Sequence, residues 1–230
     1  MNIAIVLSGG SGTRLGASIP KQYIKVYNKP IIMYCVETLL GNPHIDALVI
    51  CLAESWKNFV LKYIKDINSC KPIYYAQGGK TRQLSIFNAL KKLEQDKFQD
   101  NDIVLIHDSA RPRLSDELIN RCINVCKKHD GVLPILPIKD TIYLSKDKKH
   151  ISGLLDRNEL FAGQAPEAFK FGKYLSIHNK MPINELKNIK GSTEIAYKFG
   201  LDIAITEGDE KNFKITTMED LELFEQIVQK

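Results

Sequence analysis

The chain has 230 residues, of which 44% are hydrophobic and 26% are charged, and its net charge at pH 7 is +5. This length suits one large domain with a sizeable core, and the composition is that of a soluble globular protein. No apolar stretch approaches the roughly 20 residues of a membrane span, and the N-terminal apolar run is too short for a signal peptide. We therefore expect a cytoplasmic protein with no membrane partner.

The positions of the charged residues, cysteines and histidines reduce the number of ligand classes that the protein is expected to bind. Lys and Arg residues are spread along the chain rather than gathered into one basic tract. This pattern favours a pocket for an anionic metabolite over a nucleic-acid partner. The five cysteines have no zinc-like C-x-x-C spacing and the five histidines are scattered, which argues against a Cys/His metal site.

A Gly-rich stretch follows the first predicted strand. Residues 1–6 are an apolar, β-branched run, and the sequence SGGSGTR comes shortly after it at residues 8–14. Glycines bring backbone N–H groups together without a Cβ in the way, and such a nest of dipoles binds phosphate. Arg14 and Lys21 add two positive charges. We interpret residues 8–21 as an anionic-nucleotide loop; the alternative is an ordinary Gly-rich turn with two solvated cations.

Two better-known Gly-rich loops are excluded by the residues present. The Walker pattern requires Gly-Lys followed by Ser or Thr, whereas Gly12 is followed by Thr13 and Arg14. The dinucleotide-binding pattern requires a third glycine in register and a helix directly after it. Here Leu15 stands near the expected place of that glycine, and Pro20 interrupts any helix.

The remaining pattern alternates strands and helices. Strands are predicted over residues 47–52, 72–76, 102–107 and 131–138, and helices over residues 30–40, 55–67, 81–93 and 115–128. Residues 171–200 are predicted to be helical, residues 202–206 and 213–216 to form two last strands, and a capping box at Thr217 to open a final helix. The alternation predicts an α/β fold with a Rossmann-like, mostly parallel sheet and helices on both faces.

One segment departs from this alternation. Residues 141–144 and 150–154 flank a charged turn at residues 146–149, which is typical of a β-hairpin projecting from the sheet. Such short strands are not stable alone in water. We therefore predict that residues 139–160 are an arm that packs on a second copy of the chain.

Polar side chains gather where the predicted strands end. Ligands of open α/β sheets bind outside the carboxyl ends of the strands. The residues at or just past predicted strand ends are Arg14, Lys21, Gly78, Arg82, Ser85, Asp108, Arg111, Lys139 and Thr141. Lys214, on a late predicted strand, is able to join this group. Asp108 follows an apolar strand, where an unpaired carboxylate is costly. A partner such as Arg111 or a magnesium ion would satisfy it, and the alternative is an Asp that bonds nearby loop amides.

Six sequence segments occur together in order. They are SGGSGTR with PKQ at residues 8–22, GGKTR with Ser85 at 78–85, HDSARP at 107–112, KDTI at 139–142, DRN at 156–158, and NFKITT at 212–217. Together they resemble the family of methylerythritol-phosphate and ribitol-phosphate cytidylyltransferases, over nearly the whole chain. The resemblance implies that residues 1–230 form one nucleotidyltransferase domain, which transfers CMP from CTP to a polyol phosphate and releases pyrophosphate. It also implies that the enzyme uses Mg²⁺ and forms a homodimer through the arm.

The resemblance also implies a role for individual residues. It assigns catalysis to Arg14, Lys21 and Lys214. It assigns CTP binding to Ser8, Gly9, Gly10, Ser11, Gly12, Thr13, Gly78, Arg82 and Ser85. It assigns substrate binding to Asp108, Arg111, Thr141 and Arg157, with Asp108 also a candidate magnesium ligand. Thr141 and Arg157 would contact the acceptor phosphate bound by the other subunit.

The identity of the polyol stays open at this point. Methylerythritol enzymes usually have Thr-Pro-Gln where this chain has APE at residues 165–167, and the SGG of residues 8–10 leans toward the ribitol-phosphate branch. KDT at residues 139–141 and the DR of residues 156–157 lean toward the methylerythritol branch. Two other functions compete: nucleotidyl transfer with another base or sugar phosphate, and nucleotide binding without catalysis. The retained Arg14, Lys21 and Lys214 argue against the last of these, because a pure binder has little use for cations around a leaving group.

Overall fold

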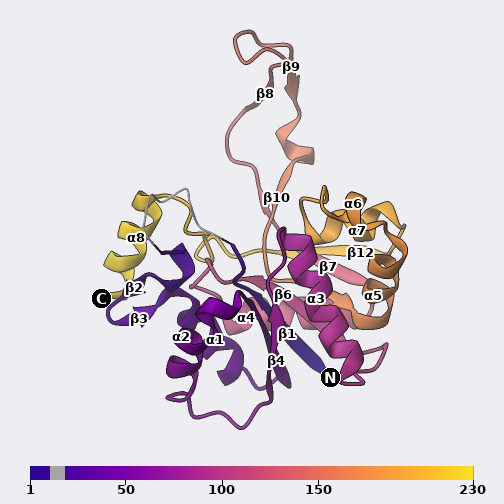
Figure 1. Cartoon of the computed structure of the whole chain (residues 1–230). Helices are drawn as coiled ribbons and strands as arrows, with labels where there is room; N and C mark the ends of the chain where they lie inside the picture. Colours follow the sequence, from indigo (N-terminus) through magenta and orange to yellow (C-terminus); the bar gives the residue numbers. More distant parts are fainter. Residues whose placement is uncertain (11–18, 230) are drawn as a thin grey trace.

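A mixed β-sheet forms the centre of the molecule (Figure 1). The computed structural model describes residues 1–10 and 19–229. Within this part of the chain the sheet has eight strands, in the order β10-β7-β11-β6-β1-β4-β5, with β12 paired to β7. The parallel part consists of β1 (Asn2–Leu7), β4 (Ala47–Leu52), β5 (Ile73–Gln77) and β6 (Ile103–Asp108). These four strands correspond to the first four that the sequence predicts.

The other half of the sheet contains antiparallel pairs. Its strands are β7 (Gly131–Pro137), β10 (Phe161–Gly163), β11 (Glu167–Lys170) and β12 (Ile203–Glu207). Strand β11 lies between β6 and β7 and is antiparallel to both, whereas β12 is parallel to β7. The sequence predicts β7 and β12 but neither β10 nor β11. Both are short strands that form only because non-local neighbours supply hydrogen-bond partners.

Helices cover both faces of the sheet, as predicted (Figure 1). Alternate residues of β1 enter opposite cores: Ala4 and Val6 pack on one face, and Ile3 and Ile5 on the other. The first core contains α1 (Ile31–Gly41), α2 (Glu54–Ile64) and α4 (Asp116–Cys126). The second contains α3 (Arg82–Gln95), α5 (Phe171–Lys180), α6 (Ile183–Leu186) and α7 (Ser192–Lys198). Burial on two faces explains why β1, β4 and β6 are continuously apolar in sequence.

A small third cluster holds the C-terminal part of the chain. Helix α8 (Met218–Val228) packs beside the two-residue strands β2 (Lys25–Val26) and β3 (Lys29–Pro30), through Phe224 and its neighbours. Thr217 caps this helix with the reciprocal capping box that the sequence predicts. The strand predicted over residues 213–216 is wrong. Ile215 donates one backbone hydrogen bond to Ala110 and buries its side chain against α8, so this segment is extended chain without a β-ladder.

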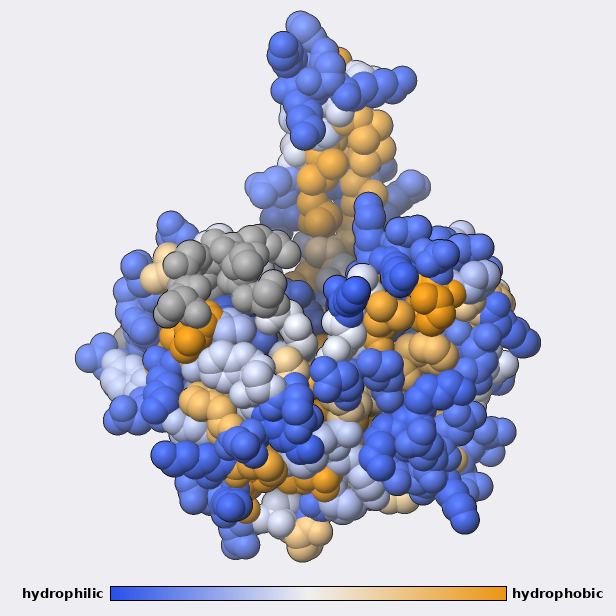
Figure 2. Space-filling view, in the orientation of Figure 1, coloured by the Kyte–Doolittle hydropathy of each residue, from blue (hydrophilic) through white to orange (hydrophobic). Residues whose placement is uncertain are grey.

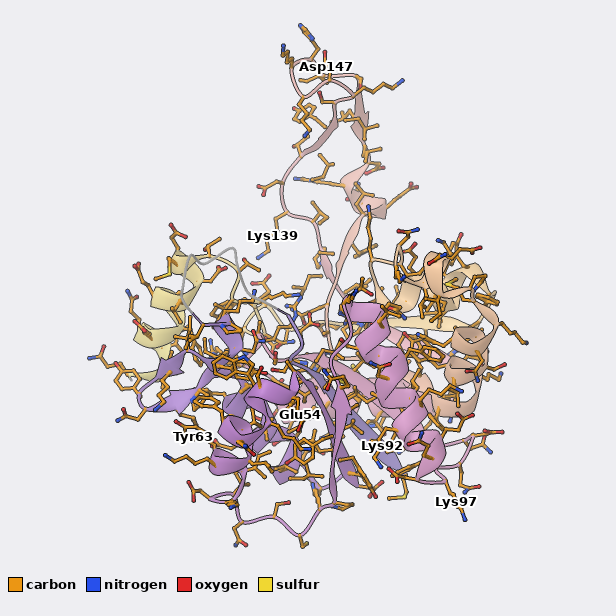
Figure 3. The ribbon with its side chains drawn as sticks, in the orientation of Figure 1. Glu54, Tyr63, Lys92, Lys97, Lys139 and Asp147 are labelled. Carbon is orange, nitrogen blue, oxygen red and sulfur yellow. The ribbon has the colours of Figure 1, made fainter. Side chains whose placement is uncertain are left out.

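The predicted hairpin is present and projects from the sheet (Figure 1). Strands β8 (Ile142–Leu144) and β9 (Gly153–Leu155) pair antiparallel, and a short 3₁₀ turn, η3 (Arg157–Glu159), follows. Figure 3 shows Asp147 at the tip, where it accepts hydrogen bonds from the backbone of Lys149 and His150. Apolar side chains run along the arm in Figure 2, and Ile151 and Leu154 are 69% and 65% exposed. The arm thus presents apolar surface that the other described residues leave exposed.

None of the helices in the described ranges has the length and apolar character needed to cross a lipid bilayer.

Candidate active site

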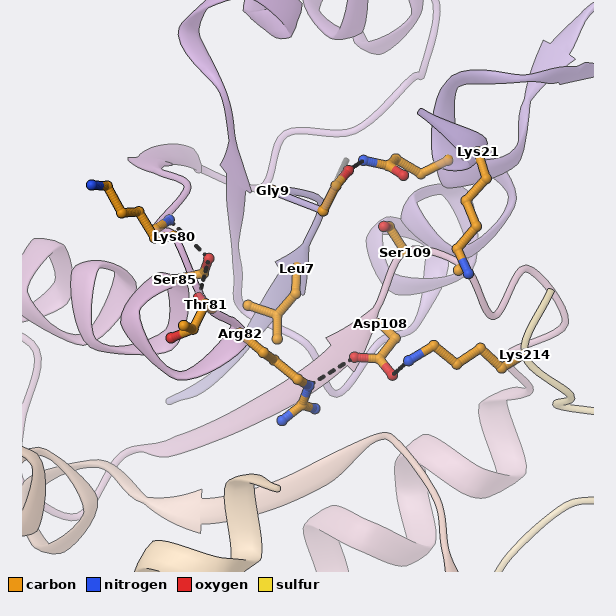
Figure 4. Close-up of a pocket in the computed structure, with 14 residues that line it drawn as sticks. Leu7, Gly9, Lys21, Lys80, Thr81, Arg82, Ser85, Asp108, Ser109 and Lys214 are labelled. Carbon is orange, nitrogen blue, oxygen red and sulfur yellow. Dashed lines mark hydrogen bonds and ion pairs between the residues drawn. The ribbon is translucent and has the colours of Figure 1, made fainter. Parts of the chain in front are cut away.

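A pocket of about 550 Å³ opens at the carboxyl ends of the parallel strands (Figure 4). Its lining comes from the turn after β1, the short helical turn η2 (Lys21–Tyr23), the start of α3, the end of β6 and the segment before α8. Seven of the predicted site residues line it: Gly9, Gly10, Lys21, Arg82, Ser85, Asp108 and Lys214. The pocket at the strand ends therefore brings together residues that are up to about 200 positions apart, although Lys214 reaches it from a segment that is not a strand.

The remaining predicted residues lie elsewhere. Ser11, Gly12, Thr13 and Arg14 fall outside the described residues. Ser8, Gly78 and Arg111 are not among the lining residues that the structure describes, although each supports a group that is. Thr141 and Arg157 lie on the exposed arm, where Arg157 Nη1 donates to the carbonyl of Lys139 at 3.1 Å. Their predicted role at the other subunit's site stays a prediction.

Two glycine segments meet backbone to backbone at the mouth of the pocket. A Cβ atom added to Gly78 would lie 3.1 Å from the Cα of Gly9, closer than most real Cβ contacts. A Cβ atom on Gly79 would lie 2.5 Å from the Cβ of Leu84. The backbone N–H of Gly79 donates to Ser85 Oγ at 2.9 Å, and Thr81 caps α3. Glycine is therefore needed at these positions for close approach of the two loops.

Two buried side chains, Gln22 and Tyr23, hydrogen-bond the backbone of the Gly-rich turn after β1. Gln22 Nε2 donates to the carbonyl oxygens of Ser8 and Gly10, at 2.9 and 2.8 Å. Ser8 Oγ donates to the hydroxyl of Tyr23 at 3.0 Å, and this hydroxyl donates to the carbonyl of Ser8. The Tyr23 ring stacks on Trp56 with ring centroids 4.3 Å apart. Ser8, predicted to bind CTP, therefore has its hydroxyl engaged by the protein, and Gln22 positions the loop.

Three cations surround the carboxylate of Asp108. Arg82 Nε lies 3.1 Å from Oδ1, and Lys214 Nζ lies 2.9 Å from Oδ2 (Figure 4). Arg111 Nε is 3.8 Å from Oδ2. Burial by itself would raise the pKa of Asp108, but Arg82 and Lys214 outweigh it and hold this pKa well below the ordinary range of a carboxyl. Asp108 is thus a permanent anion that orients the ammonium group of Lys214.

Arg82 lines the pocket and also bonds side chains from three other parts of the chain. Its Nη2 lies 3.1 Å from Glu167 Oε1, and its Nη1 donates to Ser192 Oγ. Burial lowers the pKa of Arg82, but Asp108 and Glu167 overcome that effect and raise it. Every guanidinium nitrogen therefore has a protein partner, and the predicted contact of Arg82 with cytosine and ribose stays a prediction.

Glu167 is the main residue of the site that the sequence pattern does not identify. Its Oε2 accepts hydrogen bonds from the backbone N–H and the hydroxyl of Thr193, at 2.8 and 2.6 Å. It stands at the start of β11 and joins Arg82 to the N-terminal turn of α7. Its signal in the sequence is a carboxylate between Pro166 and an apolar run. Without β11, nothing in the sequence places that carboxylate near Arg82.

Arg111 positions the segment that carries Lys214. Arg111 Nη1 donates to the carbonyl of Asn212 at 2.8 Å, and Lys21 Nζ donates to the carbonyl of Ile215 at 2.5 Å. The buried ring of His107 bonds the carbonyl of Arg111, and burial lowers the pKa of His107 to about 4, so this ring is neutral near pH 7. The segment on either side of Lys214 is therefore fixed by two cations.

Asp108, the candidate magnesium ligand, has a cation beside each of its carboxylate oxygens. No group of three His, Cys, Asp or Glu side chains within residues 1–10 and 19–229 is arranged to hold a metal ion. Both Asp108 oxygens already accept from cations, which would repel a divalent ion. Magnesium in nucleotide sites depends largely on substrate phosphates. The predicted cofactor stays a prediction, and no role of a described residue depends on it.

Comparison with known proteins identifies the family. The family model of 2-C-methyl-D-erythritol 4-phosphate cytidylyltransferase (IspD) matches residues 2–230. A ribitol-5-phosphate cytidylyltransferase of Vibrio parahaemolyticus is 34% identical over 229 residues, covering 99% of this chain and 96% of the relative. A 2-C-methyl-D-erythritol 4-phosphate cytidylyltransferase of Clostridium beijerinckii is 36% identical over 225 residues, covering 98% of this chain and 97% of the relative.

Solved structures agree with this assignment. The 2-C-methyl-D-erythritol 4-phosphate cytidylyltransferase of Francisella tularensis matches with a TM-score of 0.81 and 26% identity, covering 98% of each chain. The 4-diphosphocytidyl-2C-methyl-D-erythritol synthase of Anaerococcus prevotii matches in fold, with a TM-score of 0.83 over 100% of this chain and 96% of that one, at 23% identity. The predicted fold class and family resemblance are confirmed. The chain therefore belongs to the IspD family of cytidylyltransferases, which are nucleotidyl-transferring enzymes.

Proposed function

We propose that this chain transfers CMP from CTP to a polyol phosphate, either 2-C-methyl-D-erythritol 4-phosphate or ribitol 5-phosphate. A phosphate oxygen of the acceptor attacks the α-phosphorus of CTP and forms the new P–O bond. The bond from the α-phosphorus to the bridging oxygen breaks, and pyrophosphate leaves with the electron pair. The acceptor phosphate is already an anion, so the step needs no general base. Its obstacle is charge, because two polyanions must approach each other.

The observation that carries this proposal is the excess of fixed cations over carboxylates in the pocket. Lys21, Arg82 and Lys214 line it together with one carboxylate, Asp108. Lys21 and Lys214 hold their ammonium groups on a backbone carbonyl and on Asp108, so neither has to be ordered when the substrates arrive. Such preorganised donors stabilise charge that develops on the α-phosphate and on the leaving pyrophosphate. Arg14, outside the described residues, is assigned the same role.

The Gly-rich turn at Gly9 and Gly10 is proposed to hold the triphosphate. Ser85 and the loop at Gly78 are proposed to bind the base and the ribose. Asp108 keeps its charge over the working pH range, and we propose that it accepts a hydrogen bond from a ribose or acceptor hydroxyl. The support for this assignment is that both glycine segments border the same pocket as the cations.

The arm is proposed to complete the site of a second copy. Its exposed apolar side chains, with Tyr143 57% exposed, provide surface for a partner, and a lone two-stranded hairpin is marginally stable in water. In this account residues 1–230 are one nucleotidyltransferase domain that forms a homodimer through residues 139–160. Arg157 and Thr141 then reach the acceptor phosphate bound by the neighbouring subunit.

The experiment is a pyrophosphate-release assay of the purified chain over CTP, UTP, ATP and GTP, each with both polyol phosphates. CTP should support turnover far better than UTP, because the two bases differ in hydrogen-bond donors at one ring edge. Lys21→Ala should lower kcat by about 100-fold or more, as expected for loss of a preorganised transition-state donor. The matched control is Lys25→Ala, an exposed lysine of β2 outside the pocket.

Three results would contradict the proposal. Near wild-type turnover of Lys21→Ala at saturating substrates removes the role given to that lysine. Comparable kcat/KM for CTP, UTP and ATP removes cytidylyl specificity. Binding of CTP without turnover on any polyol phosphate favours a nucleotide-binding protein that has lost catalysis.

A further inference from the structure

A serine at the floor of the pocket is not used by the mechanism above. Ser109 follows Asp108 directly, at the end of β6, and its backbone N–H donates to the carbonyl of Leu7 at 3.1 Å. This bond fixes Ser109 beside the start of the Gly-rich turn. The residue is 4% exposed and lines the pocket. Its position is therefore set by the backbone of two neighbouring strands.

The hydroxyl of Ser109 differs from its neighbours in its hydrogen bonding. Within residues 1–10 and 19–229, Ser109 Oγ makes no hydrogen bond. Two other serines described at this edge differ: Ser8 Oγ donates to Tyr23, and Ser85 Oγ accepts from Gly79 and donates to the carbonyl of Thr81. Ser109 Oγ is not among the fully buried side-chain atoms that lack a partner in the described residues, so this oxygen is open to the pocket it lines. An unpaired hydroxyl that borders a pocket is therefore a candidate for contact with a ligand.

The surroundings of this hydroxyl favour an anionic partner. Figure 4 shows Ser109 between the Gly9 turn and the ammonium group of Lys21, on the same side of Asp108 as the turn. Ser109, Gly9 and Lys21 line the same pocket, and a hydrogen bond from a hydroxyl to an anionic oxygen is stronger than one between neutral groups. The carboxylate of the neighbouring Asp108 is paired with Arg82 and Lys214, so its charge is balanced beside this hydroxyl.

We propose that the Ser109 hydroxyl is a nucleotide-binding group that donates a hydrogen bond to a phosphate oxygen of bound CTP. This inference rests on the proposed function, since it takes CTP as the ligand of the pocket. It adds a neutral donor to the fixed cations at the end of β6. Because Ser109 has no other side-chain bond among the described residues, Ser109→Ala removes the contact without breaking a hydrogen bond of the folded protein.

Calorimetric titration of the full chain tests the inference. Ser109→Ala should bind CTP about tenfold more weakly or worse, the range expected for a hydrogen bond to a charged group, with cytidine binding unchanged. The loss should be the same factor for CTP and for 2′-deoxy-CTP. Ser109→Cys, which keeps the size of the side chain but is a poorer donor, should lie between wild type and Ser109→Ala. The matched control is Ser176→Ala on α5, outside this pocket, and thermal unfolding confirms that each variant is folded.

The outcomes separate this inference from the proposed function. Wild-type affinity of a folded Ser109→Ala for CTP overturns it. An equal loss for cytidine, or a loss confined to CTP and absent with 2′-deoxy-CTP, places the contact on the nucleoside and also overturns it. If the wild-type chain binds no CTP, the proposed function fails first, and the role of Ser109 fails with it.

Discussion

Replacement of Asp108 by asparagine removes the anion that three cations share while keeping the shape of the side chain. The Asp108 side chain is 13% exposed, whereas those of Arg82 and Lys214 are 25% and 39% exposed. Breaking a buried ion pair by removing one partner costs about 3–5 kcal/mol. Lys214 can turn toward solvent and recover hydration, which lowers the cost. We expect the free energy of unfolding to fall by about 2–3 kcal/mol near pH 7.

The pH dependence of this loss follows from the direction of the pKa shift. The pKa of Asp108 is depressed in the folded state, so its contribution to stability is complete above the unfolded pKa of about 3.9 and is lost as pH falls through the folded value. Urea unfolding of both proteins should show a constant difference from pH 5 to 7 that narrows below about pH 4.

The control for this comparison is Asp66→Asn, an exposed aspartate in the turn after α2. It should leave the free energy of unfolding within about 0.5 kcal/mol of wild type. Equal stability of Asp108→Asn and wild type at pH 7, or a difference that widens toward acid, would refute the view that Asp108 is held as an anion by its cations.

Three further predictions concern other parts of the site. Gly79→Ala should lower the free energy of unfolding by about 1–3 kcal/mol and weaken nucleotide binding, because the added Cβ would lie 2.5 Å from a side chain of α3. The control is Gly41→Ala, which has open space around it and should not destabilise the fold; urea unfolding compares the two variants. Glu167→Ala should lower kcat/KM and shift the thermal midpoint downward, since it leaves a guanidinium and a backbone N–H without their shared acceptor; full activity would show that β11 does not position the site. Mixing Lys21→Ala with Arg157→Ala protein should restore activity on subunit exchange if sites are shared across the dimer, and a mixture as inactive as its components would place Arg157 at its own subunit's site.

Local pattern was sufficient to predict the elements that are buried on both faces. Strands β1, β4 and β6 are continuous apolar runs because each side of the sheet carries helices, so burial is visible in composition alone. Strands β10 and β11 were missed because they have three and four residues and depend on pairing with β7 and β6. The alternation in Phe213 and Ile215 resembles a strand, yet these side chains pack against α8 rather than alternating across a sheet.

The sequence predicts which residues belong to the candidate site, but not which of them pair with each other. The rule that ligands bind at strand ends places Lys21, in the segment after β1, and Asp108, at the end of β6, at one edge of the sheet. Lys214 was expected there on a strand that does not form, and it reaches Asp108 from an extended segment instead. Which cation satisfies Asp108 is decided by tertiary distances, and the answer is Arg82 and Lys214, with Arg111 further away. The role of Glu167 required β11, which no local signal indicated.

The most direct test of the central claim follows the label of radioactive CTP. The chain is incubated with each polyol phosphate and either α- or γ-labelled CTP, and the products are separated. Nucleotidyl transfer predicts that the α-label appears in a cytidine-diphosphate-linked polyol and the γ-label in pyrophosphate, in equal amounts. Appearance of the γ-label in the polyol, or release of both labels without a linked product, would contradict attack of the acceptor on the α-phosphorus.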